Sequence, residues 1–118
     1  MPVSWVEHRG HDILYVDYRN LGPTECLETL HDQAAEIDGA RAPVLTLVDA
    51  RGVVFGSEFV RVAKIAAMPN TARTRKRAVV GADGFNKVLL AFFNSAATPV
   101  PMKPFATIEE ALDYLAGP

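Results

Sequence analysis

Cysteine is scarce in this sequence, since Cys26 is the only one among 118 residues. A single thiol cannot form an internal disulfide, and it cannot by itself supply the thiolate ligands of a structural zinc site. Small secreted domains commonly depend on disulfides, so the lone cysteine favours a reduced, cytoplasmic setting.

Long apolar runs are also missing. The longest uninterrupted run covers residues 88–93, whereas a membrane-spanning helix needs about twenty apolar residues. The first residues, MPVSW, do not combine a basic segment with an apolar one, so we expect no secretory signal.

Neither sign of charge dominates, because 12 basic and 14 acidic residues leave a formal net charge of −2. Nucleic-acid-binding domains usually carry a basic excess, so we expect no nucleic-acid partner. Apolar residues make up 49% of the chain and charged residues 22%, which argues against disorder. We therefore expect one folded domain over residues 1–118.

Strand and helix patterns alternate along the chain. Residues 3–8 and 12–18 are rich in β-branched and aromatic side chains, and Arg9-Gly10 between them predicts a hairpin. The remaining apolar patterns predict the order ββαβαβαβα, with strands at 44–48, 77–81 and 100–105 and helices at 23–39, 57–69, 86–94 and 107–116.

This order predicts the α/β class. Residues 44–48 are almost continuously apolar, which is typical of a central strand covered on both faces. Strands that alternate with helices imply an open, mixed but mostly parallel five-stranded sheet with about four helices. Thr107 and Glu110 have the spacing of a capping box, which predicts where the last helix begins.

Four segments suggest a family. They are Trp5 in the first strand, VLTLVDAR at 44–51, RAVVG at 77–81 and FATIEEALDYL at 105–115. Through them the chain resembles the STAS fold of the SpoIIAA anti-anti-sigma factors and, more narrowly, the SpoIIAA-like family of small bacterial proteins related to STAS and CRAL-TRIO domains. The resemblance implies a non-enzymatic domain that recognises a protein partner, a small ligand or a membrane surface, and it implies that a homodimer can form.

Ser57 is the candidate phosphorylation site. Anti-anti-sigma factors typically carry a phosphorylated serine at the start of the second helix, after an aspartate and before a glycine. Here the segment is Phe55-Gly56-Ser57-Glu58-Phe59, which keeps the serine and lacks both neighbours. A phosphate at a helix N-terminus is chemically favourable. The structural alternative is that Ser57 caps the helix with its hydroxyl.

Ligands of open α/β sheets gather beyond the carboxyl ends of the parallel strands. The candidate ligand-binding or partner-binding residues at that edge are Asp49, Arg51, Phe55, Ser57, Asp83 and Asn86. The structural alternative is a local ion pair between Asp49 and Arg51 with an Asx-type turn.

The expected third helix is apolar nearly all round. Leu89, Phe92 and Phe93 are either buried by the sheet and a neighbouring helix or exposed for a partner, an apolar ligand or a membrane surface.

A basic cluster precedes the expected strand at 77–81, at the sheet edge opposite the residues above. Four cations in five positions suit an anionic lipid headgroup, or else form a solvated loop. The four are Arg73, Arg75, Lys76 and Arg77.

Catalysis and metal binding find little support. His8 and His11 have a spacing that zinc ligands use, but no third and fourth ligand is evident. No histidine accompanies a nucleophile at the strand ends, so we expect no enzyme activity and no cofactor. The first hypothesis is a regulatory interaction domain that binds a protein partner. The second is a binder of a small apolar or lipid-like ligand with peripheral membrane association.

Overall fold

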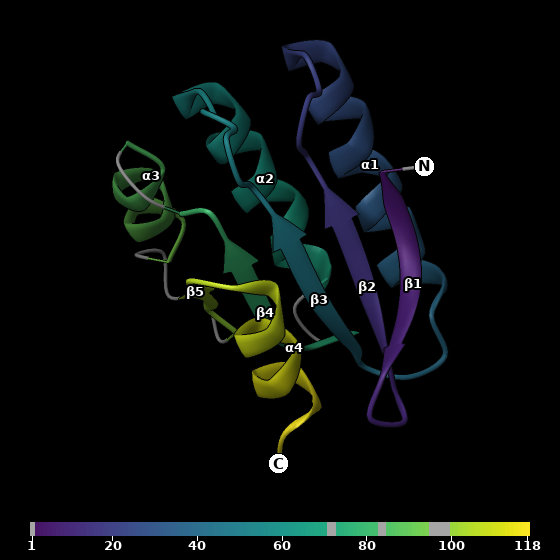
Figure 1. Cartoon of the computed structure of the whole chain (residues 1–118). Coiled ribbons are helices and arrows are strands. Elements are labelled where there is room, and N and C mark those ends of the chain that lie inside the picture. The colour runs from purple at the N-terminus through teal and green to yellow at the C-terminus, as the bar shows by residue number, and fades with distance from the viewer. Residues whose placement is uncertain (1, 71–72, 83–84, 95–99) are drawn as a thin grey trace.

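The elements of the fold follow the strand and helix patterns of the sequence. The computed structural model describes residues 2–70, 73–82, 85–94 and 100–118 (Figure 1). The elements are, in chain order, β1 (Val3–His8), β2 (His11–Asp17), α1 (Pro23–Gly39), β3 (Val44–Asp49), α2 (Ser57–Asn70), β4 (Thr74–Val80), α3 (Phe85–Asn94), β5 (Met102–Phe105) and α4 (Ile108–Ala116).

The strands form one sheet in the order β1-β2-β3-β4-β5. β1 is antiparallel to β2, and each of the other neighbouring pairs is parallel. The expected α/β class and mixed five-stranded sheet are therefore confirmed. Every residue of β3 is buried, as its continuous apolar pattern predicts.

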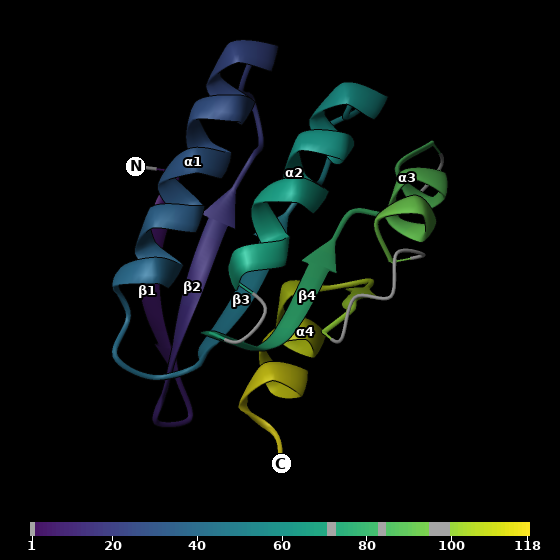
Figure 2. The same cartoon turned by 180° about the vertical axis from the view of Figure 1, so that it is seen from behind.

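Helices cover both faces of the sheet. α1 and α2 lie side by side on one face, and α4 lies on the other (Figures 1 and 2). Successive parallel strands that advance in one direction place their right-handed crossover helices on the same face. α4 follows the last strand and is free of that constraint, so it packs on the opposite face.

In the described part of the chain, apolar clusters form on both faces of the sheet. One lies on the α1–α2 face and includes Leu14, Val16 and Val48. The other lies on the α4 face and includes Ile13, Leu47 and Leu115. Adjacent strand residues point to opposite faces, so β2 and β3 supply both clusters.

The hairpin turn between β1 and β2 is the two-residue turn that the sequence predicts. Arg9 has φ 52° and Gly10 has φ 80°, and His8 pairs with His11 across the turn. Positive φ at both central residues is the mark of the type I′ turn, whose twist matches that of the strands.

β4 is longer than expected, because it begins at Thr74 and not at residue 77. The prediction that the basic residues precede the strand is therefore wrong for Arg75 and Lys76, and Arg77 lies inside the strand, as the expected range of 77–81 already had it. The strand accommodates them because adjacent residues of a strand point to opposite faces of the sheet, so Lys76 and Arg77 do not share a face. In the register with β3, Lys76 pairs with Leu45 and Arg77 pairs with Thr46. β5 begins at Met102, two residues later than expected.

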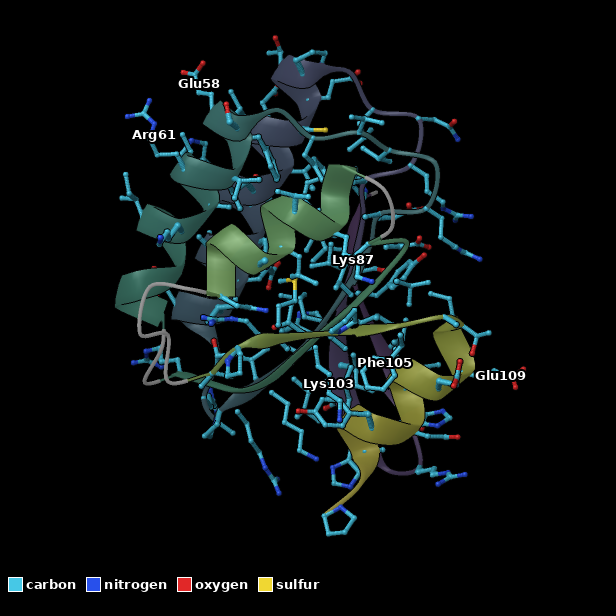
Figure 3. All side chains as sticks on the ribbon, turned by 90° about the vertical axis from the view of Figure 1, so that its left-hand side faces the viewer. Glu58, Arg61, Lys87, Lys103, Phe105 and Glu109 are labelled. Carbon is cyan, nitrogen blue, oxygen red and sulfur yellow. The ribbon has the colours of Figure 1, made fainter. Side chains whose placement is uncertain are left out.

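The last helix is held at both ends. The hydroxyl of Thr107 accepts a hydrogen bond from the backbone N–H of Glu110 at 3.1 Å, which confirms the expected cap. At the other end, Nζ of Lys76 donates to the carbonyls of Tyr114 and Gly117, each at 2.9 Å. A cation at a helix C-terminus also interacts favourably with the helix dipole. Figure 3 shows Lys103 and Phe105 of β5 beside this helix, and Phe105 packs against Tyr114.

Candidate functional site at the carboxyl ends of β2 and β3

Two copies of one short motif lie side by side where β2 and β3 end. The motif is Asp-x-Arg, and it occurs as Asp17 with Arg19 and as Asp49 with Arg51. The strands are parallel, and Asp17 pairs with Asp49 in register. We call these four residues the strand-end site; its position follows from the two neighbouring arrowheads in Figure 1.

Asp49 and Arg51 form a bidentate ion pair. Nε of Arg51 donates to Oδ1 of Asp49 at 2.9 Å, and Nη2 donates to Oδ2 at 2.8 Å. The backbone N–H of Arg51 also donates to Oδ1, at 3.3 Å. This is the local ion pair with an Asx-type turn that the sequence left open as the structural alternative.

Asp17 and Arg19 repeat that geometry. Nε of Arg19 donates to Oδ1 of Asp17 at 2.9 Å, Nη2 donates to Oδ2 at 3.0 Å, and the backbone N–H donates to Oδ1 at 3.0 Å. Nε of Arg19 also lies 3.4 Å from Oδ2 of Asp49. Both guanidinium groups therefore touch the same buried carboxylate.

Asp49 is fully buried, and Tyr15 completes its surroundings. The hydroxyl of Tyr15 donates to Oδ2 of Asp49 at 2.6 Å. Burial opposes ionisation of Asp49, but the hydrogen bonds from Arg51 and Tyr15 together outweigh it and lower the pKa of this carboxyl. Burial and the bond to Asp49 raise the pKa of Tyr15 to about 12. The carboxylate is thus ionised and held in one orientation.

The loop after β3 is anchored by aromatic side chains. Phe55 stacks on Phe59 of α2 with ring centroids 4.5 Å apart, and both meet the edge or face of buried Tyr18. The predicted contact residue Phe55 thus points inward and fixes the loop. Its neighbour Val54 is 77% exposed, so the loop presents an aliphatic side chain to solvent.

Gly81 explains how the loop passes so close to the end of β4. Its φ is +92°, and a Cβ there would lie 2.5 Å from the backbone nitrogen of Arg51. The backbone N–H of Ala50 donates to the carbonyl of Val80 at 2.8 Å. Only glycine permits this approach, so β4 helps to place Arg51.

Ser57 is exposed and is the first residue of α2. The carbonyl of Gly56 accepts the first helical hydrogen bond, from the backbone N–H of Val60 at 3.3 Å. Gly56 therefore occupies the N-cap position, and the interpretation of Ser57 as the capping residue is wrong.

The expected site residues of the third helix are described only in part. Asp83 lies outside the described residues. For Asn86, Leu89, Phe92 and Phe93 the structure describes the backbone within α3 and not the side chains. Among the described side chains of α3, Val88 is 64% exposed.

The basic residues at 73–77 do not converge on one point. Arg73 donates to the carbonyl of Ala40 at 2.9 Å, and Lys76 donates to carbonyls at the end of α4. Arg77 is buried and donates to the carbonyl of Val100 at 2.6 Å. Arg73 and Arg75 are both exposed, and Arg75, for which no side-chain hydrogen bond to a described residue is seen, remains a candidate for an anionic headgroup.

No metal cluster is evident in the described part of the chain, where no three His, Cys, Asp or Glu side chains gather to hold an ion. Nε2 of His8 instead pairs with Oδ1 of Asp113 at 3.0 Å. No helix within the described ranges is long and apolar enough to cross a membrane.

Sequence reasoning missed Arg19, Asp17 and Tyr15. The repeat of Asp-x-Arg at the ends of two predicted strands was the available signal for Asp17 and Arg19. Tyr15 carried no signal of its own, because its contact with Asp49 depends on the pairing of β2 with β3.

Comparison with known proteins yields no relative. No protein-family model matches the chain, and neither a curated protein nor a solved structure is similar to it at the significance that we required. The SpoIIAA-like resemblance therefore stays an expectation.

Proposed function

We propose that this chain is a non-enzymatic interaction domain of the SpoIIAA-like type, which binds a protein partner through the strand-end site and the loop after β3. The single observation that carries the proposal is the rigid placement of two arginines around buried Asp49. Their side chains are 43% and 46% exposed, although each is held by two hydrogen bonds to a carboxylate. Such preorganised side chains lose little conformational entropy on binding.

The neighbouring surface supports an interface. Val54 is exposed in the same loop that carries Arg51, three residues further along the chain, so this loop presents both an aliphatic and a charged side chain to solvent. Protein interfaces combine apolar contacts with arginines in this manner. Acid–base catalysis at this site is disfavoured, because both carboxylates accept hydrogen bonds from arginines and neither is free to act as a general base.

Affinity capture tests the proposal. The full chain and a double variant, Arg19→Gln with Arg51→Gln, are used to capture proteins from cells of the source organism. Arg41→Gln is the matched control, since Arg41 is exposed and precedes β3, at the opposite edge of the sheet. We expect a captured protein that, once purified, binds the wild type and the control equally and the double variant at least tenfold more weakly. Recovery of the chain alone, or equal binding by the double variant, would contradict the proposal.

A second candidate function is binding of a small apolar or lipid-like ligand at α3. The exposed side chain of Val88, beside exposed Lys87, favours it. Native mass spectrometry of protein purified from its source should then show a retained ligand of defined mass. A spectrum of the bare chain under gentle conditions would count against this candidate.

A further inference from the structure

The two Asp-x-Arg motifs are equivalent atom by atom. In each, the backbone N–H and Nε of the arginine donate to Oδ1 of the aspartate, and Nη2 donates to Oδ2. The motifs follow neighbouring parallel strands in register, and such strands are about 4.8 Å apart. The structure therefore holds two guanidinium groups at neighbouring strand ends, and in each group the edge formed by Nε and Nη2 faces the aspartate two residues earlier.

The opposite edges of both guanidinium groups are available. Among the described residues, the hydrogen bonds of Arg19 and Arg51 use the side-chain atoms Nε and Nη2 and leave Nη1 of each unused. A guanidinium group has five N–H donors, and its planar edge matches a carboxylate. The two donor groups come from neighbouring strand ends, and both lie near one atom, because Nε of Arg19 is 3.4 Å and Nη2 of Arg51 is 2.8 Å from Oδ2 of Asp49.

The charge of the site constrains what it recognises. Two aspartates and two arginines sum to no net charge, and Asp49 touches both arginines. Long-range attraction of anions is accordingly weak, and binding depends on short, directional hydrogen bonds. A ligand must then match both donor edges in position, which favours a fixed pair of oxyanions over a mobile counterion.

We propose that the strand-end site binds two carboxylates on one face of a helix of the protein partner, four residues apart in its sequence. This inference rests on the proposed function and adds the chemistry of the partner. Side chains at i and i+4 of a helix have Cβ atoms about 5–6 Å apart, close to the spacing of about 4.8 Å between the neighbouring strands whose ends carry the two arginines. Exposed Val54, in the same loop as Arg51, offers an aliphatic contact to the same partner.

Short helical peptides test the inference directly. Capped peptides of alanine and glutamine carry two glutamates at i and i+4, two glutamates at i and i+2, or one glutamate. Binding to the full chain is followed by NMR, through the Nε–H signals of Arg19 and Arg51. We expect the i, i+4 peptide to bind about fivefold or more tightly than the other two, a factor that corresponds to about 1 kcal/mol. Equal affinity for all three peptides would overturn the inference.

Variants separate geometry from charge. Arg19→Lys with Arg51→Lys keeps both charges and removes the planar donor edges, so we expect it to lose the preference for the i, i+4 peptide. Arg41→Gln should retain the preference. Circular dichroism confirms that each variant is folded, and lysine at both positions keeps the positive charges that offset the burial of Asp49. Retention of the preference by the lysine variant would overturn the inference.

Inorganic phosphate serves as a competitor in the same binding experiment. A single small oxyanion should compete only weakly, because it cannot occupy both donor edges as two carboxylates do. Tight binding of phosphate that excludes the i, i+4 peptide would overturn the inference in favour of a free-anion site. The two proposals can be refuted separately. Failure to capture a protein partner contradicts the proposed function, whereas capture of a partner without a preference for the i, i+4 peptide contradicts only the inference about two carboxylates.

Discussion

Thr46 offers a test of the energetic reasoning because its substitution should stabilise the protein. The residue lies in the middle of β3 and is 1% exposed, and Oγ1 has no hydrogen-bond partner among the described residues. Its neighbours across the sheet are Leu14 and Arg77. Valine has the same branched shape, so Thr46→Val replaces the buried hydroxyl with a methyl group and leaves the strand backbone undisturbed.

The expected gain follows from the cost of the hydroxyl. A buried polar group that makes no hydrogen bond costs about 1–3 kcal/mol. The added methyl group contributes up to about 0.8 kcal/mol through burial. The free energy of unfolding should therefore rise by about 1–4 kcal/mol. For a chain of this size this raises Tm by about 3–6 °C per kcal/mol.

Urea unfolding at constant pH, followed by circular dichroism, measures this change. Thr46→Ser is the matched control, since it keeps the hydroxyl and loses only a methyl group, and it should destabilise by about 1 kcal/mol. A lower unfolding midpoint for Thr46→Val than for the wild type would refute the reasoning. It would mean that the free energy of the Thr46 hydroxyl is lower in the folded protein than in water.

Three further predictions concern pH, backbone geometry and the last helix. Because the pKa of Tyr15 is raised from 10.0 to about 12, its share of stability is complete below about pH 10 and is lost as pH rises toward 12. Urea midpoints between about pH 9 and 12 should fall less steeply in Tyr15→Phe, and parallel slopes would contradict this. Gly81→Ala should lower the free energy of unfolding, measured in urea, by at least about 2 kcal/mol. The reason is that Gly81 has φ +92° and a Cβ there would lie 2.5 Å from the backbone nitrogen of Arg51; a variant as stable as the wild type would contradict this prediction. Lys76→Met should lower the free energy of unfolding by about 1–2 kcal/mol, because the carbonyls of Tyr114 and Gly117 lose their hydrogen-bond donor. Amide hydrogen exchange in α4 should become faster relative to α1, and unchanged exchange in α4 would contradict this prediction.

Patterns of local origin predicted most of the fold. The continuous apolar run of β3, the Arg9-Gly10 turn and the Thr107 cap each depend on residues adjacent in sequence, and each is confirmed. The start of β4 was predicted wrongly, because its cations reduce the apolar signal. Lys76 and Arg77 enter the strand because each finds carbonyl partners distant in sequence.

The candidate site divides in the same way. Asp49 and Arg51 were predicted because they follow an obvious strand, and their ion pair spans only two residues. Arg19 joins them because β2 pairs with β3 in a register that aligns Asp17 with Asp49, and nothing local to residues 17–19 specifies that alignment.

Local composition thus established the α/β class, the element order and half of the strand-end site, because hydrophobic period, turn residues and caps act over a few residues. The folded chain added the second arginine, the tyrosine below the carboxylate and the inward role of Phe55. These depend on strand register and on the packing of α2 against the sheet, which arise from contacts between segments far apart in sequence.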